Sequence, residues 1–186
     1  EFKQARHILD EFGITYKQFQ EGYYMADSIE SVSAMCYKSV KAGTRVFNLI
    51  MVEDVMIRED DRVTGLVLNW TAVEMANLHV DPLTIRSKYV IDATGHDAEV
   101  CNLLARKTGR KVSSETGAVI GEKPMWAEIA EREIVKHTGE VYPGLLSAGM
   151  VVNAVHGLPR MGPIFGGMLL SGKKVAEITA GLLNNQ

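Results

Sequence analysis

A glycine-rich stretch at residues 156–172 most restricts the folds open to this chain. Five glycines and two prolines stand there between an apolar run at residues 145–155 and a helical pattern at residues 168–183. Glycine lets a ligand approach the backbone closely, and the N-terminus of a following helix offers unpaired N–H groups to an anion. The stretch therefore predicts a cradle for a charged ligand, with a flexible surface connection as the alternative.

The arginine inside this stretch is Arg160. Its guanidinium can hold a carboxylate or a phosphate through two parallel hydrogen bonds. Long loops in compact domains are usually either functional or disordered, and the apolar residues within this one argue against disorder. We therefore expect Arg160 to bind the anionic group of a small ligand.

Length and composition predict an ordinary soluble globular protein with one domain over residues 1–186. The chain has 186 residues, of which 46% are hydrophobic and 23% charged, and domains typically have ~100–200 residues. The net charge of −3 offers no basic face for nucleic acid. No apolar run approaches the ~20 residues that cross a bilayer. Two cysteines form no disulfide framework or zinc pattern, so we expect a reducing, cytoplasmic location.

Helix signals are clearest at residues 28–41. Asp27 can cap this helix, Glu30 stands three residues further on as in a capping box, and Gly43 follows its end. Helical spacing also predicts a first helix that ends at Gly13 and a short helix over residues 97–107, capped by Asp97. The side chains expected in the core are Val32, Cys36 and Val40 of the second helix, and Val100, Cys101, Leu103 and Leu104 of the third.

The strand signals begin at Thr44, where the composition turns β-branched. Residues 45–57 and 62–71 predict a hairpin, and residues 83–93 predict a third strand. Residues 108–144 have no regular pattern, whereas residues 145–155 predict a buried strand. The chain thus contains a helix, then a β-meander, then two strands that each lead to a glycine-containing turn, and this combination predicts an α/β fold. The same order of elements is found in the C-terminal part of proteins with two dinucleotide-binding folds.

Three side chains are candidate metal ligands. His79 and Asp81 lie two residues apart, so they share a face of an extended chain. His96 follows the predicted strand at residues 83–93, and open α/β sheets bind ligands at the carboxyl ends of their strands. Two nitrogens and one oxygen suit a divalent metal such as Fe(II), with open positions for substrate. A hydrogen-bonded structural histidine is the alternative that this wide spacing leaves open.

Other polar and aromatic residues are expected mainly to have structural or surface positions. We expect Asp92 to orient the loop that follows its strand, and His156 either to shape a loop or to contact a ligand. His7 and His137 are expected to face solvent. Trp70 and Trp126 are expected in the core or in an interface.

Three stretches resemble the thiamine thiazole synthase family. Residues 152–172 closely match its C-terminal signature, and Asp92-Ala-Thr-Gly-His-Asp97 and Val80-Asp81-Pro82 match two other diagnostic stretches. The resemblance implies an FAD/NAD(P)-binding, glutathione-reductase-like three-layer fold with a β-meander. It also implies a transferase that releases nicotinamide from NAD, condenses the ADP-ribose part with glycine and inserts sulfur. The product would be an ADP-linked thiazole carboxylate for thiamine biosynthesis.

The resemblance also implies roles for single residues. Arg160 and the adjacent Met161 look like the residues that bind glycine. Asp81 and His96 look like the Fe(II) ligands, and Asp81 would reach a site shared with a neighbouring subunit of a homo-octamer. The positions that look like contacts to the NAD-derived ligand are Val52, His79, Val80, Asp81 and Met150, and those that look catalytic are His79, Asp81 and His96.

His79 determines the subtype that the resemblance implies. Fungal and plant members carry at this position the cysteine that gives up its sulfur, and imidazole has no sulfur to donate. The chain thus resembles the archaeal type, which uses external sulfide and turns over repeatedly, with His79 as a proton shuttle or a spectator. Nothing matches the opening Gly-x-Gly-x-x-Gly segment that holds the pyrophosphate, so the N-terminal βαβ unit is expected to be missing from this sequence.

Three alternatives remain for the function. A flavin-dependent oxidoreductase would share the fold, although the Pro-Arg-Met-Gly-Pro run at residues 159–163 speaks against it. A ribose 1,5-bisphosphate isomerase is an activity assigned to some archaeal relatives. A non-catalytic assembly module would follow if the N-terminal half were truly lacking.

Overall fold

The computed structural model describes residues 2–185, which form two compact units with a boundary after Asn48. Both helices and strands are present, so the predicted α/β class is confirmed. That both units belong to one dinucleotide-binding-type domain stays a prediction. Among the described helices, none combines the length and the apolar character that a bilayer span requires.

The first unit consists of two helices and a hairpin. Its elements in chain order are α1 (Phe2–Phe12), β1 (Tyr16–Gln20), β2 (Tyr23–Ala26) and α2 (Ser28–Lys41). Helix α1 stops before Gly13, as predicted. The cap on α2 is confirmed too, because the backbone N–H of Glu30 donates to Asp27 Oδ1 over 2.8 Å. The Glu30 side chain does not close a capping box, since its Oε1 accepts from the backbone N–H of Thr15.

The predicted buried face of α2 is wrong. No residue of α2 is buried; Val32 is 62% exposed, Val40 is 54% exposed and Cys36 is exposed. The spacing of apolar residues gives the helix and its stripe, but not whether a neighbouring element covers the stripe. The antiparallel β1–β2 hairpin was not predicted from the sequence either.

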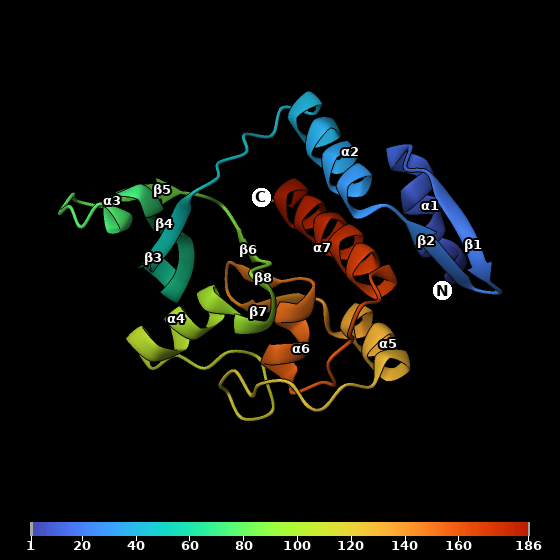
Figure 1. The fold of residues 1–186 in the computed structure, drawn as a ribbon. Coiled ribbons are helices and arrows are strands. Elements are labelled where there is room, and N and C mark those ends of the chain that lie inside the picture. Colours follow the sequence, from blue (N-terminus) through green and yellow to red (C-terminus); the bar gives the residue numbers. More distant parts are fainter. Residues whose placement is uncertain (1, 186) are drawn as a thin grey trace. The chain divides into compact units, whose positions relative to one another are not determined.

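The second unit contains two three-stranded sheets (Figure 1). The first is an antiparallel meander of β3 (Ile50–Arg58), β4 (Arg62–Trp70) and β5 (Leu83–Arg86). In the second, β8 (Leu145–Ser147) lies between β6 (Val90–Asp92), which is parallel to it, and β7 (Gly139–Tyr142), which is antiparallel.

The predicted hairpin is confirmed by β3 and β4, although residues 45–49 are not part of a strand. The predicted strand at residues 83–93 divides into β5 and β6, which belong to different sheets. Gly65 on β4 permits the close approach of β5, because a Cβ there would overlap the carbonyl oxygen of Ile85. This contact depends on the tertiary structure and leaves no periodic signal in the sequence.

The remaining helices connect and cover these sheets. Two are short 3₁₀ turns, η1 (Glu59–Asp61) and η2 (Gly95–Asp97); the α-helices are α3 (Thr71–Met75), α4 (Glu99–Thr108), α5 (Ala127–His137), α6 (Met150–His156) and α7 (Gly166–Asn184). The predicted inner face of α4 is confirmed, since Val100, Cys101, Leu103 and Leu104 are buried. Residues 108–144 are not irregular throughout, because α5 and β7 lie within them.

The predicted strand at residues 145–155 is wrong beyond Ser147. The chain turns at Gly149, where φ is +66°, and residues 150–156 form α6. Residues 150–155 are all buried, and a segment that is apolar on every side has the same sequence pattern whether it is a strand or a helix. The glycine-rich loop thus connects α6 to α7 and not a strand to a helix.

Two apolar clusters fix the position of this loop. The first joins α4 and α6 to the strands through fully buried residues that include Val63, Leu104, Leu145 and Val151. The second packs α5 and α6 against Met161 of the loop, which has 0% exposure. With Met161 buried, the neighbouring Arg160 is held at the surface of this cluster.

Candidate active site

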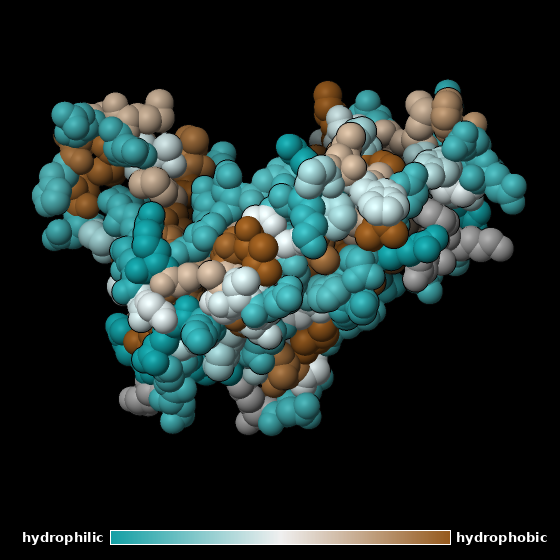
Figure 2. Space-filling model, turned by 90° about the horizontal axis from the view of Figure 1, so that it is seen from below, coloured by the Kyte–Doolittle hydropathy of each residue, from teal (hydrophilic) through white to brown (hydrophobic). Residues whose placement is uncertain are grey.

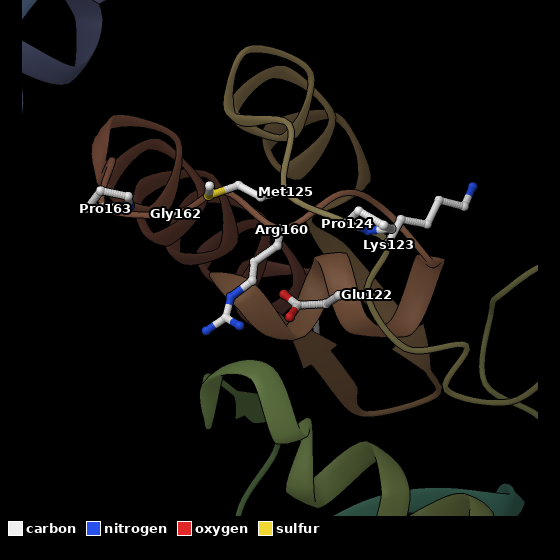
Figure 3. Close-up of a pocket in the computed structure, with 7 residues that line it drawn as sticks. All are labelled: Glu122, Lys123, Pro124, Met125, Arg160, Gly162 and Pro163. Carbon is white, nitrogen blue, oxygen red and sulfur yellow. The ribbon is translucent and has the colours of Figure 1, made fainter.

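An open cavity of about 780 Å³ lies beside the glycine-rich loop. It is lined by residues from two segments of the chain, Glu122, Lys123, Pro124 and Met125 from one and Arg160, Gly162 and Pro163 from the other (Figure 3). The glycine-rich stretch therefore lines a cavity, which agrees with the predicted cradle.

Backbone hydrogen bonds hold the two segments side by side. The N–H of Lys123 donates to the carbonyl of Leu158, and the N–H of Arg160 donates to the carbonyl of Lys123, both over 3.0 Å. The N–H of Trp126 donates in turn to the carbonyl of Arg160. At Gly162, with φ of +70°, a Cβ would come within 2.6 Å of Met125 Sδ, so glycine permits the loop to pass close to the other segment.

Arg160 is exposed at this cavity. Within residues 2–185, its guanidinium makes no hydrogen bond or ion pair. Figure 3 shows Arg160 and Glu122 on the same side of the cavity lining, with Lys123 pointing away from both. An unpaired guanidinium at a cavity wall can bind a carboxylate or a phosphate with two parallel hydrogen bonds.

His96 contacts a residue that the sequence analysis did not identify. Its Nδ1 lies 2.7 Å from Glu122 Oε2. The His96 side chain is 45% exposed and that of Glu122 only 14%. The sequence did not indicate Glu122, because this residue lies in a stretch without periodicity, 26 residues beyond His96.

His79 and Asp81 lie elsewhere in this unit. Both are exposed in the loop between α3 and β5, next to the meander, whereas His96 lies between β6 and α4 (Figure 1). Within the described part of one chain, no group of three or more His, Cys, Asp or Glu side chains could hold a metal ion. The trio inferred from spacing therefore does not assemble within a single chain, and the role of Asp81 in a neighbouring subunit's site stays a prediction.

The other predicted contact residues differ in burial. Val52 is half-buried on β3, Val80 is exposed, and Met150 is buried as the first residue of α6. The side chain of Met161 is buried in the core. The predicted contact of Met161 with the substrate can therefore involve only its main chain, and it stays a prediction.

The histidine at the end of α6 is part of an aromatic pair. The ring centroids of His156 and His137 lie 5.0 Å apart, and His137 Nδ1 is 3.0 Å from the carbonyl oxygen of Glu133. Burial, together with the neighbouring His137, lowers the pKa of His156. The expectation that His137 faces solvent is wrong, because its ring is half-buried against α6.

Asp92 orients the loop that carries His96, as predicted. It is fully buried and accepts hydrogen bonds from the backbone N–H and Oγ1 of Thr94 and from the backbone N–H of Cys101. Asp97 does not cap α4; the residue before this helix is Ala98, and the N–H of Glu99 donates to Thr94 Oγ1. The side-chain contacts of Asp92 and Thr94 thus hold the turn.

The two cysteines should react very differently. Burial and the nearby Asp92 carboxylate raise the pKa of the Cys101 thiol well above its usual value, whereas Cys36 is exposed. Because the thiolate is the nucleophile, iodoacetamide should modify Cys36 and leave Cys101 intact in the folded protein. Peptide mass mapping measures this, with urea-unfolded protein as the control in which both react. Modification of Cys101 in the folded protein at the rate of Cys36 would contradict the expectation.

Comparisons with known proteins identify the family. A family model described as the Thi4 family matches residues 2–165. The chain is 58% identical to a thiamine thiazole synthase of Methanococcoides burtonii, over 95% of this chain and 68% of that protein. It is 55% identical to one of Methanothermobacter thermautotrophicus, over 94% of this chain and 67% of that protein.

A solved structure agrees with the sequence comparisons. The crystal structure of Thermovibrio ammonificans THI4 matches with a TM-score of 0.93 at 54% identity, and the match covers 97% of this chain and 70% of that one. The resemblance noted in three short stretches therefore extends over nearly the whole chain. This chain belongs to the Thi4 family of thiamine thiazole synthases, enzymes of thiazole biosynthesis for thiamine.

Proposed function

We propose that this protein forms an ADP-linked thiazole carboxylate from NAD, glycine and sulfide, with Fe(II) as its metal. The observation that carries the proposal is the guanidinium of Arg160, which has no partner among residues 2–185 and lies on the wall of the cavity beside the glycine-rich loop. Glycine fits within this cavity, and its carboxylate can accept both hydrogen bonds of the guanidinium. Contacts of Val52, Val80 and Met150 with the NAD-derived ligand belong to the same proposal.

The donor set of His96 and Asp81 fits Fe(II). An imidazole nitrogen and a carboxylate oxygen are both suitable ligands for this ion. Metal-bound histidines usually donate their other ring N–H to a carboxylate, and the contact between His96 Nδ1 and Glu122 Oε2 has this form. When bound, Fe(II) would hold the soft sulfide anion and act as a Lewis acid.

Asp81 would complete the metal site of a neighbouring subunit in a homo-octamer. The segment that carries it, from the last residue of α3 to the first residue of β5, exposes large apolar side chains, namely Met75, Leu78, Val80 and Leu83. Figure 2 shows hydrophobic side chains on the surface at the end of the second unit that carries α3 and β5. Clustered exposed apolar residues favour a protein interface. Trp70 immediately precedes α3 and is 44% exposed, which suits an interface better than a core.

We also propose the dinucleotide-binding, three-layer form of the α/β fold and a cytoplasmic location. The parallel pairing of β6 with β8, with Asp92-Ala-Thr-Gly95 at the end of β6 and a glycine turn after β8, supports this fold. Strands that end in such turns are typical of nucleotide-binding α/β sheets.

The use of external sulfide rests on His79. Because this residue has no sulfur to donate, product formation should require added sulfide and continue over many turnovers without loss of protein mass. Product analysis with and without sulfide, combined with intact-mass spectra before and after turnover, tests this expectation. The matched variant His79→Ala should remain sulfide-dependent, with a lower rate if His79 moves a proton. A protein that becomes lighter by one hydrogen sulfide per product formed would reject external sulfide as the source.

A further inference from the structure

The pair formed by Glu122 and His96 carries an inference beyond the binding of substrates. We propose that Glu122 is a positioning residue that holds His96 in the Nδ1–H tautomer and directs a free Nε2 lone pair toward a ligand. The 2.7 Å distance between Nδ1 and Oε2 is that of a strong hydrogen bond. The identity of that ligand as Fe(II) rests on the proposed function, whereas the tautomer does not.

The tautomer follows from the chemistry of the two groups. An ionised carboxylate only accepts hydrogen bonds, so the ring nitrogen that faces it must carry the hydrogen. In a neutral imidazole the other nitrogen then has the lone pair. Because the His96 side chain is 45% exposed, this lone pair is available to a metal or another electrophile.

Both partners lie in segments that are held by hydrogen bonds outside the pair itself. On one side, Gly121 donates to the carbonyl of Ala154 over 2.9 Å and Lys123 to the carbonyl of Leu158 over 3.0 Å, so Glu122 stands between two fixed residues. On the other side, Asp92 holds Thr94, two residues before His96. The ring and the carboxylate therefore meet without needing either loop to rearrange.

The second oxygen of Glu122 argues against a purely structural role. Oε1 is buried and has no hydrogen-bond partner within the described residues. Leaving a buried oxygen unpaired is costly, and a carboxylate retained only for stability would normally have both oxygens satisfied. The single hydrogen bond that Glu122 makes among these residues is the one to His96. The carboxylate is therefore placed to hydrogen-bond His96 through Oε2, although its Oε1 is left buried without a partner among these residues.

Nuclear magnetic resonance of ¹⁵N-labelled protein without metal tests the tautomer directly. Long-range ¹H–¹⁵N spectra distinguish Nδ1–H from Nε2–H, and the His96→Gln variant assigns the signals of His96. The wild type should show Nδ1–H at neutral imidazole. Glu122→Gln should show a mixture, because an amide can both donate to and accept from the ring. Glu122→Asp keeps the charge but shortens the side chain by one methylene, and it should also lose the preference. Glu115→Gln removes a charge from an exposed residue of the same loop and should change nothing.

Binding of Fe(II) alone, measured anaerobically by calorimetry, provides the second readout. Loss of an outer carboxylate typically weakens metal binding about 10- to 100-fold, and both Glu122 variants should fall in this range relative to Glu115→Gln. An Nε2–H tautomer in the wild type would overturn the proposal, and this outcome needs no variant to fold. An unchanged tautomer in folded Glu122→Gln and Glu122→Asp would overturn it as well. A wild type with the Nδ1–H tautomer that binds no Fe(II) would support the positioning role and reject the metal of the proposed function.

Discussion

Replacing Arg160 with alanine should weaken glycine binding tens to thousands of fold and leave binding of the ADP-ribose part largely intact. Truncating one partner of a desolvated, charge-assisted pair costs on the order of 2 to 5 kcal/mol. The protein should still fold, because Arg160 is exposed and its backbone hydrogen bonds to Lys123 and Trp126 do not need the side chain. The dependence of product formation on glycine concentration measures the effect.

Two further variants separate charge from geometry at this position. Arg160→Lys keeps the charge but cannot form two parallel hydrogen bonds, so it should recover only part of the affinity. Lys123→Ala removes a cation that lines the same cavity but points away from Arg160 (Figure 3), and it should have little effect. Normal product formation by Arg160→Ala at ordinary glycine concentrations would show that Arg160 does not bind the carboxylate.

Asp81→Asn and His96→Ala should each abolish sulfur transfer. If Asp81 and His96 supply the protein ligands of Fe(II), either change removes half of the donors, and the remaining ligand alone holds the ion poorly. Both side chains are exposed, so both variants should fold. Asp81→Asn should keep its melting temperature, whereas His96→Ala removes the hydrogen-bond partner of Glu122 and should lower it slightly. Metal analysis after anaerobic loading, alongside product analysis, measures the loss.

The control for these two variants is His7→Ala, which removes an exposed histidine from α1. It should keep both Fe(II) and activity. Full Fe(II) occupancy at unchanged affinity in both Asp81→Asn and His96→Ala would reject these ligands. A lowered melting temperature without any change in metal binding would instead assign the two residues to stability.

The sequence by itself determined the features whose signals act within a few residues. Asp27 caps α2, the polar turn after Ile57 joins two strands of a hairpin, and the apolar spacing of α4 correctly gives its buried face. The stretch at residues 152–172 carried the resemblance to the family, which the comparisons confirm. Arg160, Gly162 and Pro163 within it line a cavity, and ligand binding by this loop stays a prediction. A cap, a turn and the spacing of an amphipathic stripe depend on neighbouring residues alone, so the sequence encodes them. Whether the stripe is buried, as on α4 but not on α2, depends on the tertiary structure.

The tertiary structure decided what depends on contacts between distant segments. Residues 145–155 are apolar on every side, so their pattern could not show that β8 ends at Ser147 and that α6 follows. The spacing on α2 could not show that its stripe remains exposed. Glu122 meets His96 only because residues 121–126 pair with the chain near Arg160. Such pairings arise from packing and hydrogen bonding in three dimensions, and no periodicity along the chain encodes them.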